Sequence, residues 1–554
     1  TSSSLLARGQ KSQCRSPAWI SAQTLVPQGL AYAMLAGLPP VVGLYASTVP
    51  LAAYALFGSS RHLAVGPVAM VSLVVVARCS AIVPEVGSPD YVRLVLLLSL
   101  MVGALQVALG LLRAGFFVNL LSHAVISGFT SAAAILIALS QLRQVLGIAL
   151  PPHHTALGLL GAAARGIGDT HPATLAVGLG SIAALVVLKR LAARFPSAIA
   201  VLAAGTLLSW LLGLDARGVK LVGAVPGGLP GLSAPDLSLP DAALLLPAAL
   251  TIVFVGFIES ISIAQVIAVK ERYEVSANRE LVALGLANVA AGLFSGLPVT
   301  GGLSRTAVNY QAGARTPLSS VVTAGLVLLT LAALTRLFHF VPNAVLGATV
   351  IVAVAGLVDL RAPRRLFAVK RSDGWALVGA FAGTLALGVE AGVLLGVALS
   401  LGLFIWRSAH PHTAELGYLP AQGVFRNIAR FPEARTLPEA LIVRVDASLY
   451  FANMSFLEDW LRRHLHERPA VKWVIMDMSG VNDIDAVAIE SLERLMEGYR
   501  EHGIEFAFAG MKGPVRDLVA RAGWPERCGK RIDYLGIEQA LRDLGLARPD
   551  LAPS

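Results

Sequence analysis

Long apolar runs separated by short polar loops fill the chain from about residue 17 to about residue 408. Many of these runs are about 17–25 residues long, which is the length that a helix needs to cross a bilayer. After about residue 409, charged residues return every few positions, apolar stretches shorten to strand length and the helices become amphipathic. The pattern therefore predicts a helical membrane domain followed by a soluble C-terminal domain.

Two of the predicted spans are too short or too broken to cross a membrane as ordinary helices. One opens at Gly66-Pro67 and the other at Gly301-Gly302, and they are third in the first seven spans and third in the second seven. Interrupted spans at matching positions of two halves indicate an inverted-repeat transporter. The full set of predicted spans is 17–38, 41–58, 66–83, 91–113, 121–147, 172–190, 197–213, 242–269, 279–296, 301–311, 318–338, 343–359, 374–389 and 391–408.

The distribution of basic residues predicts the orientation of these spans. Loops on the side of the N-terminus, including 270–279 and 360–371, carry more Lys and Arg than loops on the other side. Cytoplasmic loops carry such an excess, so we expect both termini and the soluble domain in the cytoplasm, and the protein in the inner or plasma membrane. The first 35 residues contain no signal-peptide apolar region followed by a cleavage site.

The C-terminal region alternates apolar strands with helices. Strands are expected within 424–431, 440–453, 471–481 and 505–510, and helices at about 455–467, 485–501, 514–523 and 536–545. This alternation predicts an α/β sandwich with helices on a mainly parallel sheet. The predicted domains are an N-terminal cytoplasmic segment (1–16), a transmembrane transport domain (17–408, with repeats 17–213 and 242–408), a linker (409–423) and the α/β domain (424–550).

Composition supports a membrane protein and excludes several other classes. The chain of 554 residues is 55% hydrophobic and 14% charged, against about 25% charged in an average soluble domain. Its net charge of +10 is spread over loops and amphipathic faces, with no basic stripe and interleaved aromatics of the kind that binds nucleic acid. The three cysteines, Cys14, Cys79 and Cys528, lie far apart and predict neither disulfides nor a metal site.

No enzyme signature is present. A P-loop, HExxH, GxSxG and a paired acidic motif are all missing from the sequence. We therefore expect no enzymatic activity and no cofactor, and transport that is secondary or passive.

The interrupted spans predict an anion site. Proline and glycine free the backbone N–H groups at two helix N-termini, which we expect to point at one another and which each carry about half a positive charge. Ser304 adds a hydroxyl donor and Arg305 a full positive charge. An arginine at bilayer depth costs at least about 2.5–3.5 kcal/mol and usually marks a functional site. The alternatives are that the glycines serve close helix packing and that Arg305 snorkels to the interface.

Three further polar residues lie in apolar spans. Glu259 is the only carboxylate in the run 242–269, and it could take a proton, bind Na⁺ or pair with Arg305. Glu259 therefore either couples transport to a cation or gates the site, or it forms an ion pair that is only structural. Gln28 and Tyr32 are one helical turn apart and share a face, either at the site or in ordinary helix packing.

Several segments resemble the SulP, or solute carrier 26, anion transporters. The stretch "PVVGLYASTVPLAAYALFGSSRH" (40–62) is similar to the family signature, with Val42 where tyrosine is usual and His62 where an acidic residue is usual. "LVPQGLAYAMLAGLPP" (25–40), "VGPVAMVSL" (65–73) and "PVTGGLSRTAVN" (298–309) resemble its first, third and tenth spans. The resemblance covers nearly the whole chain.

The resemblance implies a seven-plus-seven inverted-repeat fold with a core and a gate domain that move as an elevator. Its anion site would lie between the third and tenth half-helices, with side chains from the first and eighth spans. Carried over by position, this implicates Gln28, Tyr32, Val68, Ala69, Glu259, Ser304 and Arg305. The substrate-binding set that we predict also includes Pro67, Gly301, Gly302 and Leu303, with Glu259 as the coupling residue.

The soluble domain resembles a STAS domain, named for sulfate transporters and anti-sigma-factor antagonists. The matching segments are 444–453 and 474–492. Where anti-sigma antagonists have a phosphorylatable serine after an aspartate, Asp485 is followed here by Ala486, so we expect no phosphorylation at that loop. Family precedent implies a homodimer, with STAS contributing to assembly or regulation.

The leading hypothesis is a secondary active transporter of inorganic or small organic anions, of the sulfate, bicarbonate, chloride or dicarboxylate class. Its coupling ion would be H⁺ or Na⁺. The transport domain would be surrounded by membrane lipid. One alternative is a nucleobase–cation symporter, which shares this architecture but uses acidic residues on both the eighth and tenth spans and lacks STAS. The other is a non-transporting membrane sensor that signals through STAS.

Overall fold

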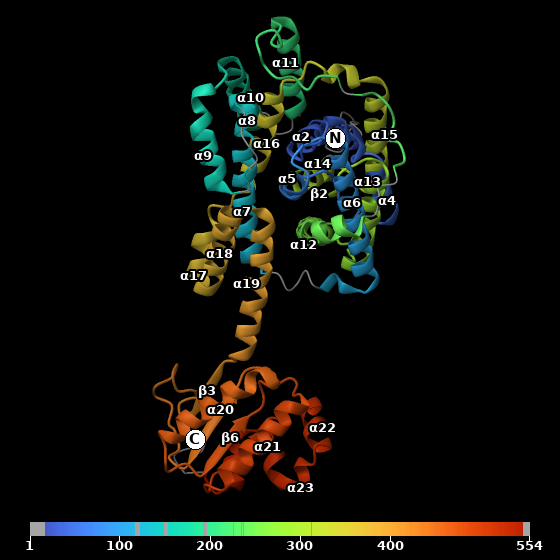
Figure 1. The fold of residues 1–554 in the computed structure, drawn as a ribbon. Helices are drawn as coiled ribbons and strands as arrows, with labels where there is room; N and C mark the ends of the chain where they lie inside the picture. The colour runs from blue at the N-terminus through green and yellow to red at the C-terminus, as the bar shows by residue number, and fades with distance from the viewer. Residues whose placement is uncertain are drawn as a thin grey trace, which may run out of the picture. The chain divides into compact units, whose positions relative to one another are not determined.

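The computed structural model describes residues 17–116, 122–148, 153, 155–191, 197–224, 226–233, 235, 238–311 and 313–546. Within these, the side chains of residues 17–24, 303, 304, 311, 336 and 390 lie outside the description. The chain divides after Leu401 into two compact units, each with its own hydrophobic core. The first unit is helical and the second is an α/β domain (Figure 1).

The helices of the first unit follow the predicted spans in order. They are α2 (Pro17–Leu35), α3 (Pro40–Tyr45), α4 (Val49–Phe57), α5 (Ala69–Ile82), α6 (Pro89–Leu111), α7 (His123–Ser140), α8 (Leu142–Leu146), α9 (Ala156–Gly166), α10 (Pro172–Leu191), α11 (Ser197–Leu212), α12 (Leu239–Lys270), α13 (Ala277–Leu293), α14 (Leu303–Gln311), α15 (Leu318–Ala333), α16 (Asn343–Ala355), α17 (Ala362–Val369) and α18 (Arg371–Leu387). Helix α19 (Val389–Ala409) runs past the division between the units. Among the described residues, six helical segments are long and apolar enough to cross a membrane.

Several predicted spans differ in detail from the helices. The span 41–58 is divided into α3 and α4 by a turn at residues 46–48, with Pro50 in the first turn of α4, a position where proline is tolerated because its missing N–H would be unpaired there anyway. The span 121–147 is divided into α7 and the short α8. Helices α9 and α17 were not predicted, because each is shorter than a membrane span.

Glycines allow α6 and α13 to pack closely. A Cβ atom on Gly103 would lie 2.6 Å from the backbone nitrogen of Val289, and one on Gly285 would lie 2.7 Å from that of Val107. Small residues at a helix interface let two backbones approach within van der Waals contact. At these positions the glycines therefore serve helix packing.

The second unit contains a five-stranded sheet in the order β4-β3-β5-β6-β7. Its strands are β3 (Thr413–Leu419), β4 (Val424–Asn427), β5 (Ala440–Val445), β6 (Trp473–Asp477) and β7 (Glu505–Ala509). Its helices are α20 (Phe451–His466), α21 (Ala486–Arg500), α22 (Gly513–Arg521), α23 (Trp524–Cys528) and α24 (Ile537–Asp543). Strands β5, β6 and β7 are parallel, as predicted, while β3 is antiparallel to both of its neighbours.

Alternating side chains of the parallel strands enter two cores, one on each face of the sheet. In β6, Val474 and Met476 belong to one core and Ile475 to the other. Because successive side chains of a strand point to opposite faces, the near-continuous apolar composition of β5 and β6 reflects burial on both sides. This architecture is the predicted α/β sandwich.

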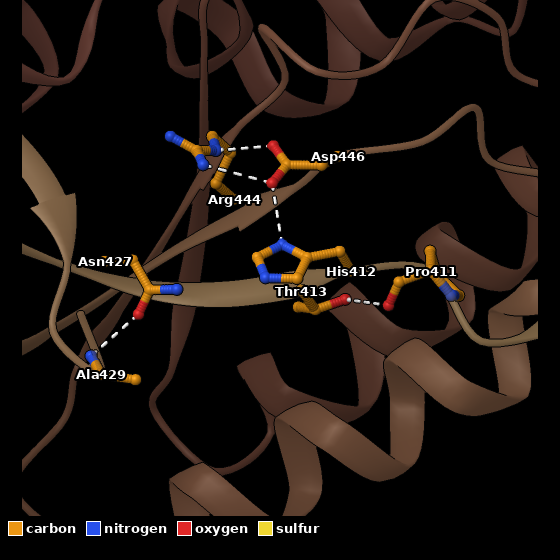
Figure 2. Close-up of polar contacts among 7 residues, drawn as sticks. All are labelled: Pro411, His412, Thr413, Asn427, Ala429, Arg444 and Asp446. Carbon is orange, nitrogen blue, oxygen red and sulfur yellow. Dashed lines mark hydrogen bonds and ion pairs between the residues drawn. The ribbon is translucent and has the colours of Figure 1, made fainter. Parts of the chain in front are cut away.

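The predicted linker 409–423 is wrong in one respect, because it contains β3. Asp446, directly after β5, accepts hydrogen bonds from Arg444 Nε at 2.6 Å and Nη2 at 3.2 Å, and its Oδ2 lies 2.9 Å from His412 Nδ1 (Figure 2). In β3 itself, Glu415 is 6% exposed and forms a bidentate ion pair with Arg468. The contacts of His412 with Asp446 and of Glu415 with Arg468 are long-range in sequence, so no local pattern indicated that this segment joins the sheet.

Candidate functional site

The two broken spans meet as a two-stranded ribbon. Strand β1 (Val65–Gly66) pairs antiparallel with β2 (Thr300–Gly301), and the pairing sets Val65 opposite Gly301. The chain continues from β1 to α5 and from β2 to α14, so antiparallel pairing directs the two continuing segments to opposite ends of the ribbon. The interruption that Gly66-Pro67 and Gly301-Gly302 predicted is confirmed.

The start of α5 carries free donors. Its N-cap, Val68, has extended backbone, and no side chain in the described part of the chain caps the helix. The first N–H groups of a helix have no intrahelical acceptor and carry the positive end of its dipole. The N-terminus of α5 can therefore donate hydrogen bonds to an anion.

Hydroxyl groups hold β2 against α12. Thr300 Oγ1 donates to the carbonyl oxygen of Gly256 at 2.6 Å and lies 2.8 Å from Ser260 Oγ. Ser260 Oγ in turn accepts from the backbone nitrogen of Gly301 at 2.8 Å. Thr300 and Ser260 are fully buried, so these bonds replace the water that the unwound backbone would otherwise need.

Asn288 on α13 supports the residue that precedes β2. Its Oδ1 accepts from the backbone nitrogen of Val299 at 2.7 Å, and its Nδ2 donates to the carbonyl oxygen of Val299 at 2.9 Å. The same Nδ2 is 2.9 Å from Gln106 Oε1 on α6. An amide side chain thus pairs with an extended residue as a neighbouring strand would, and it ties the ribbon to two helices.

Arg305 lies between the two broken spans. Its side chain is 2% exposed, and Nη1 donates to the carbonyl oxygen of Pro67, just before α5. Its Nε and Nη2 have no hydrogen-bond partner among the described residues. Gly302 leaves room for the guanidinium, because a Cβ atom there would lie 2.8 Å from Nη2 and the arginine side chain would have to shift. The guanidinium therefore stays inside the protein, and the alternative that it snorkels to the interface is wrong.

Glu259 lies on α12 with an unpartnered oxygen. The residue is half-buried, its Oε2 is buried, and no hydrogen bond reaches that atom from the described residues. No ion pair within 4 Å joins it to a described basic residue, although Glu259, Arg305 and Tyr32 lie within electrostatic range of one another. The structure therefore does not contain the direct Glu259–Arg305 ion pair that was one sequence-based alternative.

The predicted residues are brought together to different degrees. Tyr32 is buried near both charged groups, while Gln28 is half-buried on the same helix. Gly301 is part of β2, and Pro67 and Gly302 directly follow β1 and β2, so their backbone groups lie at the ribbon. Val68 and Ala69, both buried, open α5. The predicted contributions of the Leu303 and Ser304 side chains lie outside the described residues.

A small cavity beside Arg305 has a volume of about 10 Å³, which is room for about one water molecule. Its lining is Leu25, Leu51, Ala64, Val65, Arg305, Asn309, Ser320 and Thr323. These residues come from α2, α4, β1, α14 and α15 and from the residue before β1. Binding of a polyatomic anion beside Arg305 therefore requires a wider space than this cavity.

Sequence reasoning missed Ser260, Thr300 and Asn288, and also Glu280. Glu280 is fully buried near the start of α13 and accepts hydrogen bonds from Tyr54, from the backbone and hydroxyl of Ser59 and from the backbone of Ser60, all at 2.7–2.9 Å. The only feature in the sequence that could have indicated Glu280 was a carboxylate at the edge of an apolar run. Through these hydrogen bonds, Glu280 joins α13 to the Gly-Ser-Ser-Arg loop after α4.

The first unit is built of apolar helices, and two of its predicted spans are broken at the point where the buried Arg305 contacts the residue before α5. These features define the class of the protein, a polytopic transporter with an attached α/β domain. Comparisons with known proteins identify the family. Residues 19–380 match the model of the sulfate permease family, and residues 431–529 match the STAS domain. The chain belongs to the sulfate permease family, whose members are transporters and not enzymes.

The relatives match over nearly the whole chain. It is 40% identical to the probable sulfate transporter 4.2 of Arabidopsis thaliana, over 94% of this chain and 79% of that protein. It is 35% identical to a probable sulfate transporter of Mycobacterium tuberculosis, over 94% of this chain and 92% of that protein. These similarities decide against the nucleobase–cation symporter hypothesis.

Solved structures support the fold. The murine solute carrier 26 family member A9 anion transporter in the inward-facing state matches with a TM-score of 0.88 and 25% identity, covering 96% of this chain and 91% of that one. The transmembrane domain of a cyanobacterial bicarbonate transporter, BicA, matches with a TM-score of 0.59 and 26% identity, covering 70% of this chain and 96% of that one. The predicted fold class, a helical multi-span transporter with a C-terminal STAS domain, is confirmed.

Proposed function

We propose that this protein carries sulfate across a membrane as a secondary transporter, in symport with protons. Relatives that match over nearly the whole chain are named probable sulfate transporters, which favours sulfate over the other anions that the site chemistry allows. The observation that carries the proposal is the guanidinium of Arg305, buried between the broken spans with two N–H donor atoms unpartnered among the described residues.

Sulfate suits this donor set because it is a tetrahedral dianion that accepts hydrogen bonds in several directions. The free N–H groups at the start of α5 supply donors and a positive dipole. Arg305 supplies a full charge, and charge-assisted hydrogen bonds to an oxyanion are roughly twice as strong as neutral ones. The residues proposed to bind sulfate are those of the predicted set, namely Gln28, Tyr32, Pro67, Val68, Ala69, Gly301, Gly302, Leu303, Ser304 and Arg305.

Glu259 is the proposed coupling residue. A carboxyl group in an apolar environment binds a proton more readily than one in water, because burial disfavours the charged form. Its unpartnered Oε2 lies near Arg305 without a direct ion pair. A proton on Glu259 would leave the positive charge of Arg305 free to hold the dianion. In this scheme the core carries anion and proton together as it slides against the gate.

The experiment is uptake of labelled sulfate by proteoliposomes that contain the whole protein, with an imposed pH gradient. We expect uptake that rises when the outside is acidified, and competition by selenate, a tetrahedral dianion, in excess of that by chloride, bicarbonate or a dicarboxylate. Uptake of chloride or bicarbonate that sulfate does not inhibit would contradict the choice of substrate. Absence of flux for every anion would favour the membrane-sensor hypothesis.

The orientation and assembly are part of the proposal. The excess of basic residues in loops such as 360–371 supports cytoplasmic termini and a cytoplasmic STAS domain in a plasma or inner membrane. Family precedent supports a homodimer. Accessibility of single introduced cysteines in intact cells tests the first, and the mass of the protein in detergent tests the second.

A further inference from the structure

A basic amphipathic helix connects α16 to α18 at the predicted cytoplasmic boundary of the membrane. This helix, α17 (Ala362–Val369), lies beside α18 (Figure 1). Its buried Ala362 packs with Ala124 of α7 and Leu377 of α18. Its neighbours on both sides along the chain are predicted spans, which end at residue 359 and begin at residue 374. From these predicted bounds, we expect the helix at the level where acyl chains give way to headgroups.

Contacts at both ends hold α17 in a defined place. Asp359 Oδ1 accepts from the backbone nitrogens of Arg361 and Ala362 at 2.9 and 3.0 Å, so its carboxylate satisfies the first donors of the helix. Phe367 meets Trp375 of α18 edge to face, with ring centroids 5.4 Å apart. The segment is thus an ordered helix that presents fixed faces.

The exposed side chains of this region are of two kinds. Leu360, Val369 and Trp375 are 81%, 82% and 66% exposed, which is costly in water but favourable against acyl chains and the interface, where tryptophan is enriched. The exposed basic residues are Arg361, Arg364, Arg365, Lys370 and Arg371. None of these five forms an ion pair within 4 Å with a described carboxylate.

We propose that α17 and its flanking residues bind anionic phospholipid headgroups of the adjacent leaflet. Clusters of four to eight Lys and Arg next to a membrane span or on an amphipathic helix attract anionic lipid, at about fivefold in binding for each basic side chain near the surface. Apolar side chains in the same segment enter the acyl boundary and hold the helix there. Because α17 packs on α7 and α18, the bound lipid stabilises this part of the transport domain. The proposal does not depend on which anion is transported.

The test uses native mass spectrometry of the purified whole protein, titrated with phosphatidylglycerol or phosphatidylcholine. We expect the unaltered protein to bind the first phosphatidylglycerol molecules at least fivefold more tightly than phosphatidylcholine. The variant Arg364→Gln/Arg365→Gln/Arg371→Gln should lose most of this preference. The variant with lysine at the same three positions keeps the charge and should keep the preference, which separates loss of charge from misfolding.

A matched control removes three charges elsewhere, in Arg165→Gln/Arg217→Gln/Lys220→Gln, all exposed residues of loops predicted on the opposite side. It should leave the preference unchanged. Equal loss in this control, or an undiminished preference in the α17 glutamine variant, would overturn the proposal. Displacement of phosphatidylglycerol by millimolar inorganic phosphate would also overturn it, because the partner would then be free phosphate and not a lipid surface.

Discussion

Arg305 makes one hydrogen bond to the protein, to the carbonyl oxygen of Pro67, and keeps its remaining N–H donors unpartnered among the described residues. A buried guanidinium in this state is expensive, since unsatisfied charged donors lose their hydration without compensation. A protein gains from retaining it only if a ligand or a moving element completes its bonds. We therefore expect the Arg305 side chain to bind the proposed anion with its unpartnered donors while its Nη1 holds the carbonyl oxygen of Pro67.

We predict that Arg305→Gln lowers sulfate uptake by about ten- to a hundredfold, because a hydrogen bond to a charged group contributes roughly 1.5–3 kcal/mol. Initial rates in proteoliposomes measure the change. Arg315→Gln, on an exposed loop residue nearby in the chain, is the control and should transport normally. Full activity of Arg305→Gln would exclude a direct role for the guanidinium.

At Glu259 the prediction concerns pH. Glutamine resembles the protonated carboxyl group but cannot release a proton, so Glu259→Gln should transport sulfate at a rate that no longer responds to an imposed pH gradient. The exposed Glu274→Gln is the matched control and should respond as the unaltered protein does. Unchanged pH dependence in Glu259→Gln would assign coupling to another group.

At the scale of elements, the site depends on a ribbon of two residues per strand that cannot be stable alone. Three helices supply what the ribbon lacks: Thr300 and Ser260 bind it to α12, Asn288 binds it to α13, and Gln106 extends the network to α6. The bonds from the backbone nitrogens of Gly301 and Val299 to Ser260 and Asn288 satisfy donors that lie inside a membrane domain, where no bulk water is present.

We predict that Thr300→Val, which preserves shape but removes the hydroxyl group, destabilises the protein by about 0.5–1.5 kcal/mol, because the Gly256 carbonyl and Ser260 Oγ each lose one of their hydrogen-bond partners. It should also raise the KM for sulfate more than it lowers the maximal rate, because the start of α14 shifts. Thermal unfolding in detergent and uptake kinetics measure the two effects. Thr316→Val, at an exposed position, should do neither; a normal KM in Thr300→Val would show that the bonds are structural only.

At the scale of the whole molecule, the chain forms two compact units with separate hydrophobic cores. In the STAS domain, Asp446 joins β3 to β5 through His412 and Arg444 (Figure 2). Burial alone would raise the pKa of Asp446, but its hydrogen bonds to Arg444 and His412 hold that pKa below its ordinary value. A lowered pKa in the folded state stabilises the domain above the ordinary value, about 3.9, and this contribution is lost as the pH falls through the folded value.

We therefore expect Asp446→Asn to destabilise the STAS domain at pH 7 and to make little difference at a pH below the folded pKa of Asp446. Hydrogen exchange at the amides of β5 and β6, followed in the whole protein from pH 7 downward, measures the difference. His412→Asn, which removes one of the two partners, should give a smaller effect of the same sign. An Asp446→Asn penalty that persists at low pH would show that the side chain acts through shape and not through charge.

Local chemistry in the sequence was enough to predict the helical class, the two broken spans and the parallel part of the STAS sheet. Apolar length follows from bilayer thickness, closely spaced proline and glycine residues favour a break in a helix, and a strand buried on both faces has a continuous apolar centre, as Val474, Ile475 and Met476 of β6 show. Arg305 could be singled out for the same reason, since a charge in an apolar run is costly in any fold.

Contacts between distant segments could not be predicted in this way. Asn288 and Ser260 have no local feature that separates them from other polar residues in membrane helices, and their importance follows only from the approach of α13 and α12 to β2. Strand β3 carries a buried glutamate that is acceptable only because Arg468 lies opposite, and the Glu259–Arg305 ion pair that charge alone suggested is not formed. Periodicity and breaks are properties of neighbouring residues, whereas the partner of a buried polar atom is chosen by how the whole chain packs.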